Sequence, residues 1–180
     1  MPGEHTLYRK IQVVLDYAKN GKHEDEKTLV DYISSRKPTN FIYYYRDKKT
    51  DKIAFGYSEN SIKRAIQMCC DLKLLRGPKL ELTKVGVSAS DPRRFTTIIA
   101  RRVTEFIDRK GVPLSTVETA IRKVLHAPDP EPPTTRAIWD RIAHPKEDID
   151  FVTFAQLLNL LGQSKQLNMS QRRIYLPVSS

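Results

Sequence analysis

The sequence predicts a mostly helical fold of the α+β class, in which small β-ribbons follow groups of amphipathic helices. Apolar residues recur at helical spacing in separate segments, and short runs rich in β-branched and aromatic residues lie between turn signals. The charge of this 180-residue chain, +10 in total, is divided evenly: residues 1–92 carry 17 basic and 12 acidic side chains, and residues 93–180 carry 14 and 9. A basic tail would place the excess positive charge at one end of the chain only, so these patterns indicate two folded units.

The first half reads as two helices, a hairpin, a third helix and a ribbon. Helical periodicity, turn residues and a Ser cap mark the limits of these elements. The predicted elements are a helix over residues 7–20, a shorter one over 29–35, a hairpin over 41–57 with a polar tip, a helix from Ser58 to Arg76, and a basic ribbon that turns at Gly77-Pro78 and closes on residues 82–87. The hairpin is either an extension of a sheet or a separate protrusion.

The helix after Ser58, the tight basic ribbon and the ending Leu82-Thr83-Lys84-Val85-Gly86 stand in immediate succession. This succession resembles the third helix and wing of a winged-helix domain, and an LTxxG ending often accompanies that wing. The resemblance implies a DNA-binding shape, with a helix face for the groove and a ribbon for the adjacent phosphates.

The second half is expected to repeat this order and resembles a second winged helix. A connector helix runs from Arg93 to Lys110. Ser115 is expected to cap the next helix, Thr134 or Thr135 to cap the one after it, and the last helix begins at Asp150. Residues 166–169 and 173–176 bracket a last turn. The sequence therefore predicts two tandem winged-helix-like domains joined by a helix: residues 1–91 with an inserted hairpin at 41–57, a connector at 92–112, and residues 113–180.

Candidate DNA-binding side chains follow from the predicted helix faces and ribbon tips. Arg and Lys suit guanine or phosphate, and Asn and Gln suit adenine, although each such face could also be an ordinary solvated surface. The candidates are Asn60, Ser61, Lys63, Arg64 and Gln67 on the third helix, Arg76 and Lys79 on its wing, Lys48 and Lys49 on the hairpin tip, Thr153, Gln156 and Asn159 on the last helix, and Arg172 and Arg173 in the final turn.

The hairpin strands are rich in aromatic residues, Tyr43, Tyr44, Tyr45, Phe55 and Tyr57. We expect most of these rings to form cross-strand pairs that are half-buried against the domain. Stacking of single-stranded nucleic acid on the rings beside a basic tip is a second interpretation, and a dimer contact is a third.

Sequence motifs of catalysis and metal binding are missing. The only cysteines, Cys69 and Cys70, are adjacent, so neither a zinc site nor an unstrained intrachain disulfide is expected, and Cys69 falls on the apolar helix face. The four histidines are scattered, and no nucleophile elbow, phosphate-binding loop or HExxH motif occurs. We therefore expect a protein that is not an enzyme and needs no cofactor or metal.

The basic charge favours polyanions, because bound cations release the counterions of DNA. The sequence therefore predicts sequence-specific binding of double-stranded DNA, as a transcription regulator, a replication initiator or a targeting factor of a defence or mobile element. The alternative is a winged-helix protein–protein adaptor or a subunit of a larger nucleic-acid complex, and a homodimer or protein partner remains open. Without a signal peptide or a long apolar run, the expected location is cytoplasmic, or nuclear in a eukaryote, with no membrane contact.

Overall fold

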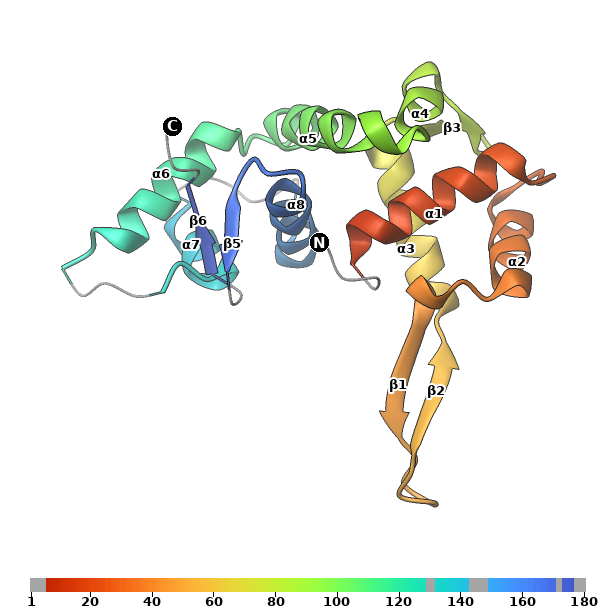
Figure 1. The fold of residues 1–180 in the computed structure, drawn as a ribbon. Coiled ribbons are helices and arrows are strands. Elements are labelled where there is room, and N and C mark those ends of the chain that lie inside the picture. Colours follow the sequence, from red (N-terminus) through yellow and green to blue (C-terminus); the bar gives the residue numbers. More distant parts are fainter. Residues whose placement is uncertain (1–5, 129–131, 143–148, 171–172, 177–180) are drawn as a thin grey trace. The chain divides into compact units, whose positions relative to one another are not determined.

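The computed structural model describes residues 6–128, 132–142, 149–170 and 173–176. The chain divides into two compact units, residues 1–95 and 96–180, which are described separately below (Figure 1). Both units are mostly helical, and their strands form small antiparallel two-stranded sheets. The expected α+β class is therefore confirmed at this level.

In unit 1, the helices α1 (Leu7–Asn20), α2 (Glu26–Arg36) and α3 (Glu59–Asp71) pack together through their apolar faces. Each begins at a polar cap: Thr6, Asp25 and Ser58 accept hydrogen bonds from the backbone of the first turn. The periodicity predicted all three helices. Their shared core consists of Ile11, Val14, Leu15, Leu29, Ile33, Ile62, Ala65, Ile66 and Cys69, together with Phe41, each at most 1% exposed.

Helix α3 is shorter than the predicted span from Ser58 to Arg76. It ends at Asp71, because Lys73 adopts a left-handed backbone with φ of 56°. The amide of Lys73 donates to the carbonyl oxygen of Cys70, and that of Leu74 donates to Cys69, which turns the chain away from the helix axis. Residues 75 and 76 therefore lie in a strand.

The hairpin follows a 3₁₀ turn at Thr39–Phe41 and consists of β1 (Ile42–Arg46) and β2 (Ile53–Tyr57). These strands pair with each other alone within the described part of the chain. The hairpin extends away from the helices of unit 1 (Figure 1), so it is a separate protrusion rather than an extension of a sheet.

The ribbon after α3 pairs β3 (Leu75–Arg76) with β4 (Glu81–Leu82), and Gly77 at the turn has a φ of 69°. The prediction that the ribbon continues through Val87 is wrong. Thr83 caps a further helix, α4 (Lys84–Ala89), by accepting a hydrogen bond from the amide of Gly86 at 2.9 Å. A Cβ at Gly86 would collide with the carbonyl oxygen of Leu74, so the glycine of the LTxxG motif allows α4 to pack closely on the ribbon.

Helix α5 (Pro92–Arg109) begins in unit 1 and continues into unit 2, which contains α6 (Leu114–Leu125), α7 (Thr135–Arg141), α8 (Phe151–Gln163), β5 (Asn168–Ser170) and β6 (Arg173–Tyr175). The prediction that Ser115 caps α6 is wrong: Pro113 occupies the cap position, with φ of −60°, and Ser115 lies inside the first turn. The caps at Thr134 and Asp150 are confirmed.

The core of unit 2 gathers around α8. The ring of Phe154 lies 4.9 Å from that of Trp139, measured between centroids, and Ile121 and Leu158 are at most 1% exposed. The amide of Ile174 in β6 donates to the carbonyl oxygen of Pro133 at 2.9 Å, which ties the segment before α7 to the ribbon. In unit 1 the β3–β4 ribbon follows α1, α2 and α3, and in unit 2 the β5–β6 ribbon follows α6, α7 and α8.

Candidate nucleic-acid interface

Helix α3 has a buried face and a polar face. The residues predicted to point inward, Ile62, Ala65, Ile66 and Cys69, are buried, and four of the five candidate base-reading residues are exposed. The exposed candidates are Asn60, Lys63, Arg64 and Gln67. Ser61 is only half-buried and differs from these four because its hydroxyl is already engaged by another side chain.

That side chain belongs to Lys10 of α1, which is not among the candidates predicted from the sequence. Its Nζ donates to Oγ of Ser61 at 2.6 Å and lies 5.8 Å from the centroid of the Phe41 ring. Burial, and then the neighbouring charge of Arg64, lower the pKa of Lys10 below its ordinary value. Lys10 therefore adds a second cation to the first turns of α3.

The acidic residues of α3 do not neutralise this pair in the described part of the chain. Neither Lys10 nor Arg64 forms an ion pair there, and Glu59 is exposed. At the far end of the helix, Nε2 of Gln67 donates to a carboxylate oxygen of Asp71 at 2.9 Å. The basic character of the helix is thus concentrated at its N-terminal half.

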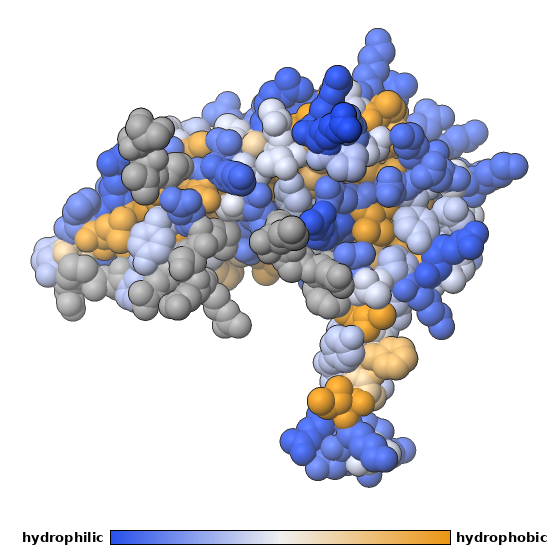
Figure 2. Space-filling view, viewed as in Figure 1, coloured by the Kyte–Doolittle hydropathy of each residue, from blue (hydrophilic) through white to orange (hydrophobic). Residues whose placement is uncertain are grey.

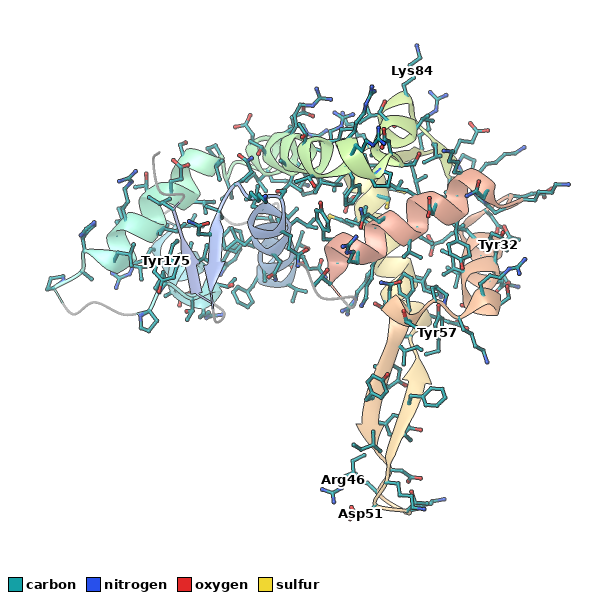
Figure 3. All side chains as sticks on the ribbon, viewed as in Figure 1. Tyr32, Arg46, Asp51, Tyr57, Lys84 and Tyr175 are labelled. Atoms are coloured by element: carbon teal, nitrogen blue, oxygen red, sulfur yellow. The ribbon has the colours of Figure 1, made fainter. Side chains whose placement is uncertain are left out.

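The β3–β4 ribbon presents a second group of cations. Arg76 and Lys79 are exposed on either side of Gly77, as the sequence predicted. Lys84, which begins α4, is also exposed and projects from its helix (Figure 3). Lys84 was not among the predicted candidates, because the sequence pattern placed it in the ribbon, whereas the cap at Thr83 places it on a helix.

The hairpin carries Lys48 and Lys49 at an exposed tip, where Nε of Arg46 lies 2.7 Å from a carboxylate oxygen of Asp51 (Figure 3). The expectation that its rings are half-buried against the domain is wrong for most of them. The exposed fractions are 50% for Tyr43, 68% for Tyr44, 49% for Tyr45 and 72% for Phe55. A hairpin that projects from the helices has no neighbour among the described residues to cover these rings, whereas Tyr57, at its base, is half-buried near Phe41.

The corresponding face of unit 2 has a different chemistry. Thr153 and Gln156 are half-buried, Asn159 is exposed, and α8 contains no charged residue. Val152, on the same helix, is 57% exposed. Arg172 lies outside the described residues, and for Arg173 the structure describes only its place at the start of β6.

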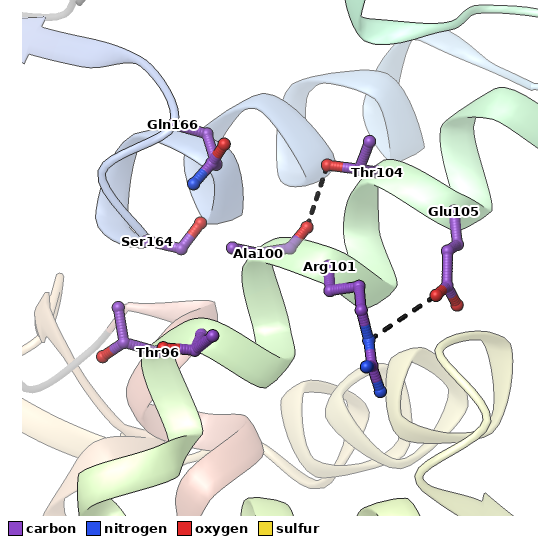
Figure 4. Close-up of a pocket in the computed structure, with 8 residues that line it drawn as sticks. Thr96, Ala100, Arg101, Thr104, Glu105, Ser164 and Gln166 are labelled. Carbon is purple, nitrogen blue, oxygen red and sulfur yellow. Dashed lines mark hydrogen bonds and ion pairs between the residues drawn. The ribbon is translucent and has the colours of Figure 1, made fainter.

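A cleft of about 410 Å³ lies in unit 2 along α5 (Figure 4). Thr96, Thr104 and Ser164 contribute hydroxyl groups to it, and Arg101 pairs with Glu105 at 3.6 Å. Among the described residues, no group of His, Cys, Asp and Glu side chains could hold a metal ion. Cys69 and Cys70 are free, and burial raises the pKa of the Cys69 thiol well above its ordinary value, so this cysteine packs as an apolar residue, as predicted.

Comparisons with protein-family models, with curated proteins and with solved structures found no match to this chain. None of the helices in the described ranges has the length and apolar character required to cross a bilayer. The function of the chain is therefore inferred from its own residues.

Proposed function

We propose that this chain binds double-stranded DNA sequence-specifically, with α3 in the major groove and the β3–β4 ribbon against the adjacent backbone. The observation that carries this proposal is the cationic pair of Lys10 and Arg64 beside the first turns of α3. Neighbouring positive charges repel each other unless an anion lies between them. Neither Lys10 nor Arg64 has an acidic partner in the described ranges. A DNA phosphate would offset that repulsion.

The exposed side chains of α3 supply the means of reading bases. A major groove about 12 Å wide admits an α-helix, and each base pair presents a distinct set of donors and acceptors there. Asn60 and Gln67 suit adenine, and Lys63 suits guanine. Ser61 is proposed to act through Lys10, because its hydroxyl holds that cation in place.

We propose further that both units are winged helices in tandem. In each unit the segment that follows the first of three helices contacts the ribbon: the segment after α1 contacts the β3–β4 ribbon, and the segment after α6 contacts the β5–β6 ribbon. In unit 1, Nε2 of His23 lies 3.4 Å from the carbonyl oxygen of Leu80. In unit 2, the amide of Ile174 binds the carbonyl oxygen of Pro133. This shared connection supports one architecture used twice, with a hairpin inserted between the second and third helices of unit 1.

Unit 2 has two candidate roles. The first is base reading by Thr153, Gln156 and Asn159, with positive charge supplied by Arg172 and Arg173. A protein contact is the second candidate, because α8 lacks charge and exposes Val152. In that case unit 2 is an adaptor that joins the DNA-bound unit 1 to a larger complex, or that forms a homodimer.

The chemistry required by this function is binding alone, with no cofactor or catalytic step. The biological role that fits it is a transcription regulator, a replication initiator or a targeting factor. All three roles need a protein that finds one DNA sequence among many, which phosphate contacts alone do not provide.

The proposal is tested by selecting bound sequences from a random duplex pool and measuring gel shifts of the selected duplex at two salt concentrations. Arg64→Ala and Lys63→Ala are expected to weaken binding to the selected duplex more than to an unrelated one. Arg76→Ala is expected to weaken both equally and to lower the salt slope by about 1. Lys19→Ala, a change of an exposed lysine at the far end of α1, is the control. Unchanged binding by Arg64→Ala would contradict the role of α3.

A further inference from the structure

One face of the β1–β2 hairpin exposes an apolar stripe. Tyr44 and Phe55 are directly opposite each other in the register, and Ile53 follows on the same face, opposite Arg46. Their exposed fractions are 68%, 72% and 80%, and Figure 2 shows the apolar colours along the strands of the protruding arm. Exposed aromatic and aliphatic side chains in one contiguous patch mark a binding surface more often than an inert one.

Side chains on the opposite face of the hairpin stabilise the pairing of β1 with β2. The ring of Tyr43 lies across Gly56, where a Cβ would come within 2.5 Å of it, and the centroid of Tyr45 lies 6.0 Å away. A tyrosine ring that covers a glycine on the neighbouring strand stabilises the pairing of the two strands. The stripe of Tyr44 and Phe55 is therefore not needed to hold the hairpin together.

The tip of the arm is basic, and its acidic groups are occupied. Asp51 pairs with Arg46 at 2.7 Å, and Asp47 accepts hydrogen bonds from the amide of Lys49 and the hydroxyl of Thr50 at 2.9 and 3.0 Å. These hydrogen bonds lower the pKa of Asp47, which remains ionised and bound within the turn. Lys48, Lys49 and Lys52 are exposed and form no ion pair with any described residue. Figure 2 shows the hydrophilic tip beyond the apolar strands.

Rings beside unpaired lysines match the chemistry of unstacked nucleotides. A base offers a flat π face to an aromatic ring, and its phosphate offers a negative charge to a lysine a few ångströms away. A second copy of this chain would cover the rings but would also bring its own lysines to the same place. We propose that the β1–β2 hairpin binds single-stranded DNA, with bases stacked on Tyr44 and Phe55 and phosphates held by the lysines of the tip.

The choice of DNA over RNA rests on the proposed function of α3. The base of the hairpin leads directly into α3 through Ser58, whose amide donates to the carbonyl oxygen of Phe41 at 3.1 Å. A helix fits the major groove of B-form DNA, whereas the major groove of an RNA duplex is too narrow for side chains to read. A single strand that continues from a DNA duplex bound at α3 is itself DNA, so DNA is the single strand expected at the hairpin.

The test measures fluorescence anisotropy with a labelled oligothymidylate of about 15 nucleotides, a length that spans one typical single-strand site and forms no duplex. The variant Tyr44→Ile/Phe55→Ile removes both rings but keeps apolar surface and strand propensity. It is expected to bind the oligonucleotide at least about tenfold more weakly than the wild type. The conservative Tyr44→Phe, which keeps the ring, is expected to bind within about twofold of the wild type.

Three results would overturn the inference. The first is equal binding of oligothymidylate by the wild type and the double Ile variant. The second is tighter binding of an oligouridylate of equal length, which would assign the arm to RNA. The third combines two measurements: the wild type self-associates in sedimentation, and the double Ile variant does not self-associate but binds oligothymidylate like the wild type. This result would assign the apolar stripe to contact with a second copy of the chain.

The test separates this inference from the proposed function. Arg64→Ala is expected to bind oligothymidylate like the wild type, and the double Ile variant is expected to bind the selected duplex like the wild type. Binding of the single-stranded probe therefore tests only the proposal for the hairpin, and binding of the selected duplex tests only the role of α3.

Discussion

Lys10 and Ser61, which belong to α1 and α3, are joined by a hydrogen bond of 2.6 Å from Nζ to Oγ. The bond holds a half-buried cation beside the guanidinium of Arg64, and burial together with that guanidinium lowers the pKa of the lysine. A cation fixed in this way loses little side-chain entropy when an anion arrives, because its rotamer is already restricted.

The first prediction concerns this lysine. Lys10→Met keeps an apolar stem but removes the charge, so binding of the selected duplex is expected to weaken, and the slope of log affinity against log salt is expected to fall by about 0.9. Anisotropy measurements over a series of salt concentrations give that slope. The matched control is Lys19→Met, roughly 13 Å farther along the helix axis. Equal effects of the two changes would mean that affinity depends only on the net charge of the protein and that Lys10 makes no specific phosphate contact.

The second prediction concerns pH. A phosphate beside Lys10 favours its charged form and raises its lowered pKa back toward the ordinary value of 10.5, so the complex takes up a proton in the alkaline range. Affinity is therefore expected to fall as pH rises through the window from that lowered pKa to 10.5. The contribution of Lys10 to the folding stability of the free protein is expected to have the opposite pH dependence. The unfolded chain binds more protons than the folded chain in this window, so this contribution rises with pH.

The variant Lys10→Arg tests this linkage, because arginine stays charged throughout the alkaline range. Its affinity for the duplex is expected to be independent of pH where that of the wild type declines. Anisotropy titrations from neutral pH up to pH 10.5, the upper end of that window, measure both profiles on one duplex. Parallel profiles for the two proteins would show that another group is responsible.

Local patterns predicted most helices and both ribbons of this chain, because apolar periodicity and polar caps act within a few residues. The Lys10–Ser61 bond joins residues 51 positions apart, and nothing near Lys10 in the sequence marks it as different from other lysines. The exposure of Tyr44 and Phe55 was missed for a related reason. A β-rich run of aromatic residues has the same sequence pattern whether or not another element covers its rings, and the exposure of this hairpin follows only from the tertiary structure.

The end of α3 was missed because its stop signal is not a glycine. Lys73 takes the left-handed conformation that glycine usually supplies, and the apolar spacing continues through Leu74 and Leu75. The helical pattern therefore runs past the structural end of the helix. Of the candidate residues on the first turns of α3, Asn60, Lys63 and Arg64 were predicted correctly as exposed, because the Ser58 cap fixed where those turns begin. Ser61 is the exception and is half-buried.

The third prediction concerns Gly86 in α4. Alanine is the better helix former by about 1 kcal/mol, so propensity alone predicts that Gly86→Ala is stabilising. A Cβ there meets the carbonyl oxygen of Leu74, a backbone atom that cannot rotate away. We expect a net loss of about 1–3 kcal/mol in the free energy of unfolding, measured with urea. Val87→Ala, on an exposed position of the same helix, is the control and is expected to change the free energy by less than about 0.5 kcal/mol.

The fourth prediction concerns Tyr57 at the base of the hairpin. Its hydroxyl is buried and finds no hydrogen-bond partner among the described residues, and burial raises its pKa to about 12. A buried hydroxyl without a partner costs free energy, so Tyr57→Phe is expected to leave the free energy of unfolding unchanged or to raise it by about 1 kcal/mol. Urea unfolding near neutral pH measures this change. Tyr44→Phe, which removes an exposed hydroxyl, is the control and is expected to have no effect.

The alkaline limb of the stability curve provides an independent measurement on the same variant. In the unfolded chain Tyr57 ionises near its ordinary pKa of 10.0, and in the fold it ionises at about 12, so the folded state holds more protons between these values. Stability of the wild type is therefore expected to fall as pH rises through this window. Tyr57→Phe removes this contribution, and its stability is expected to decline less steeply in urea titrations on either side of pH 10.0. A loss of stability by the variant at neutral pH would mean that the hydroxyl is hydrogen-bonded in solution. An equally steep alkaline decline would mean that the pKa of Tyr57 is the same in the folded and unfolded chain.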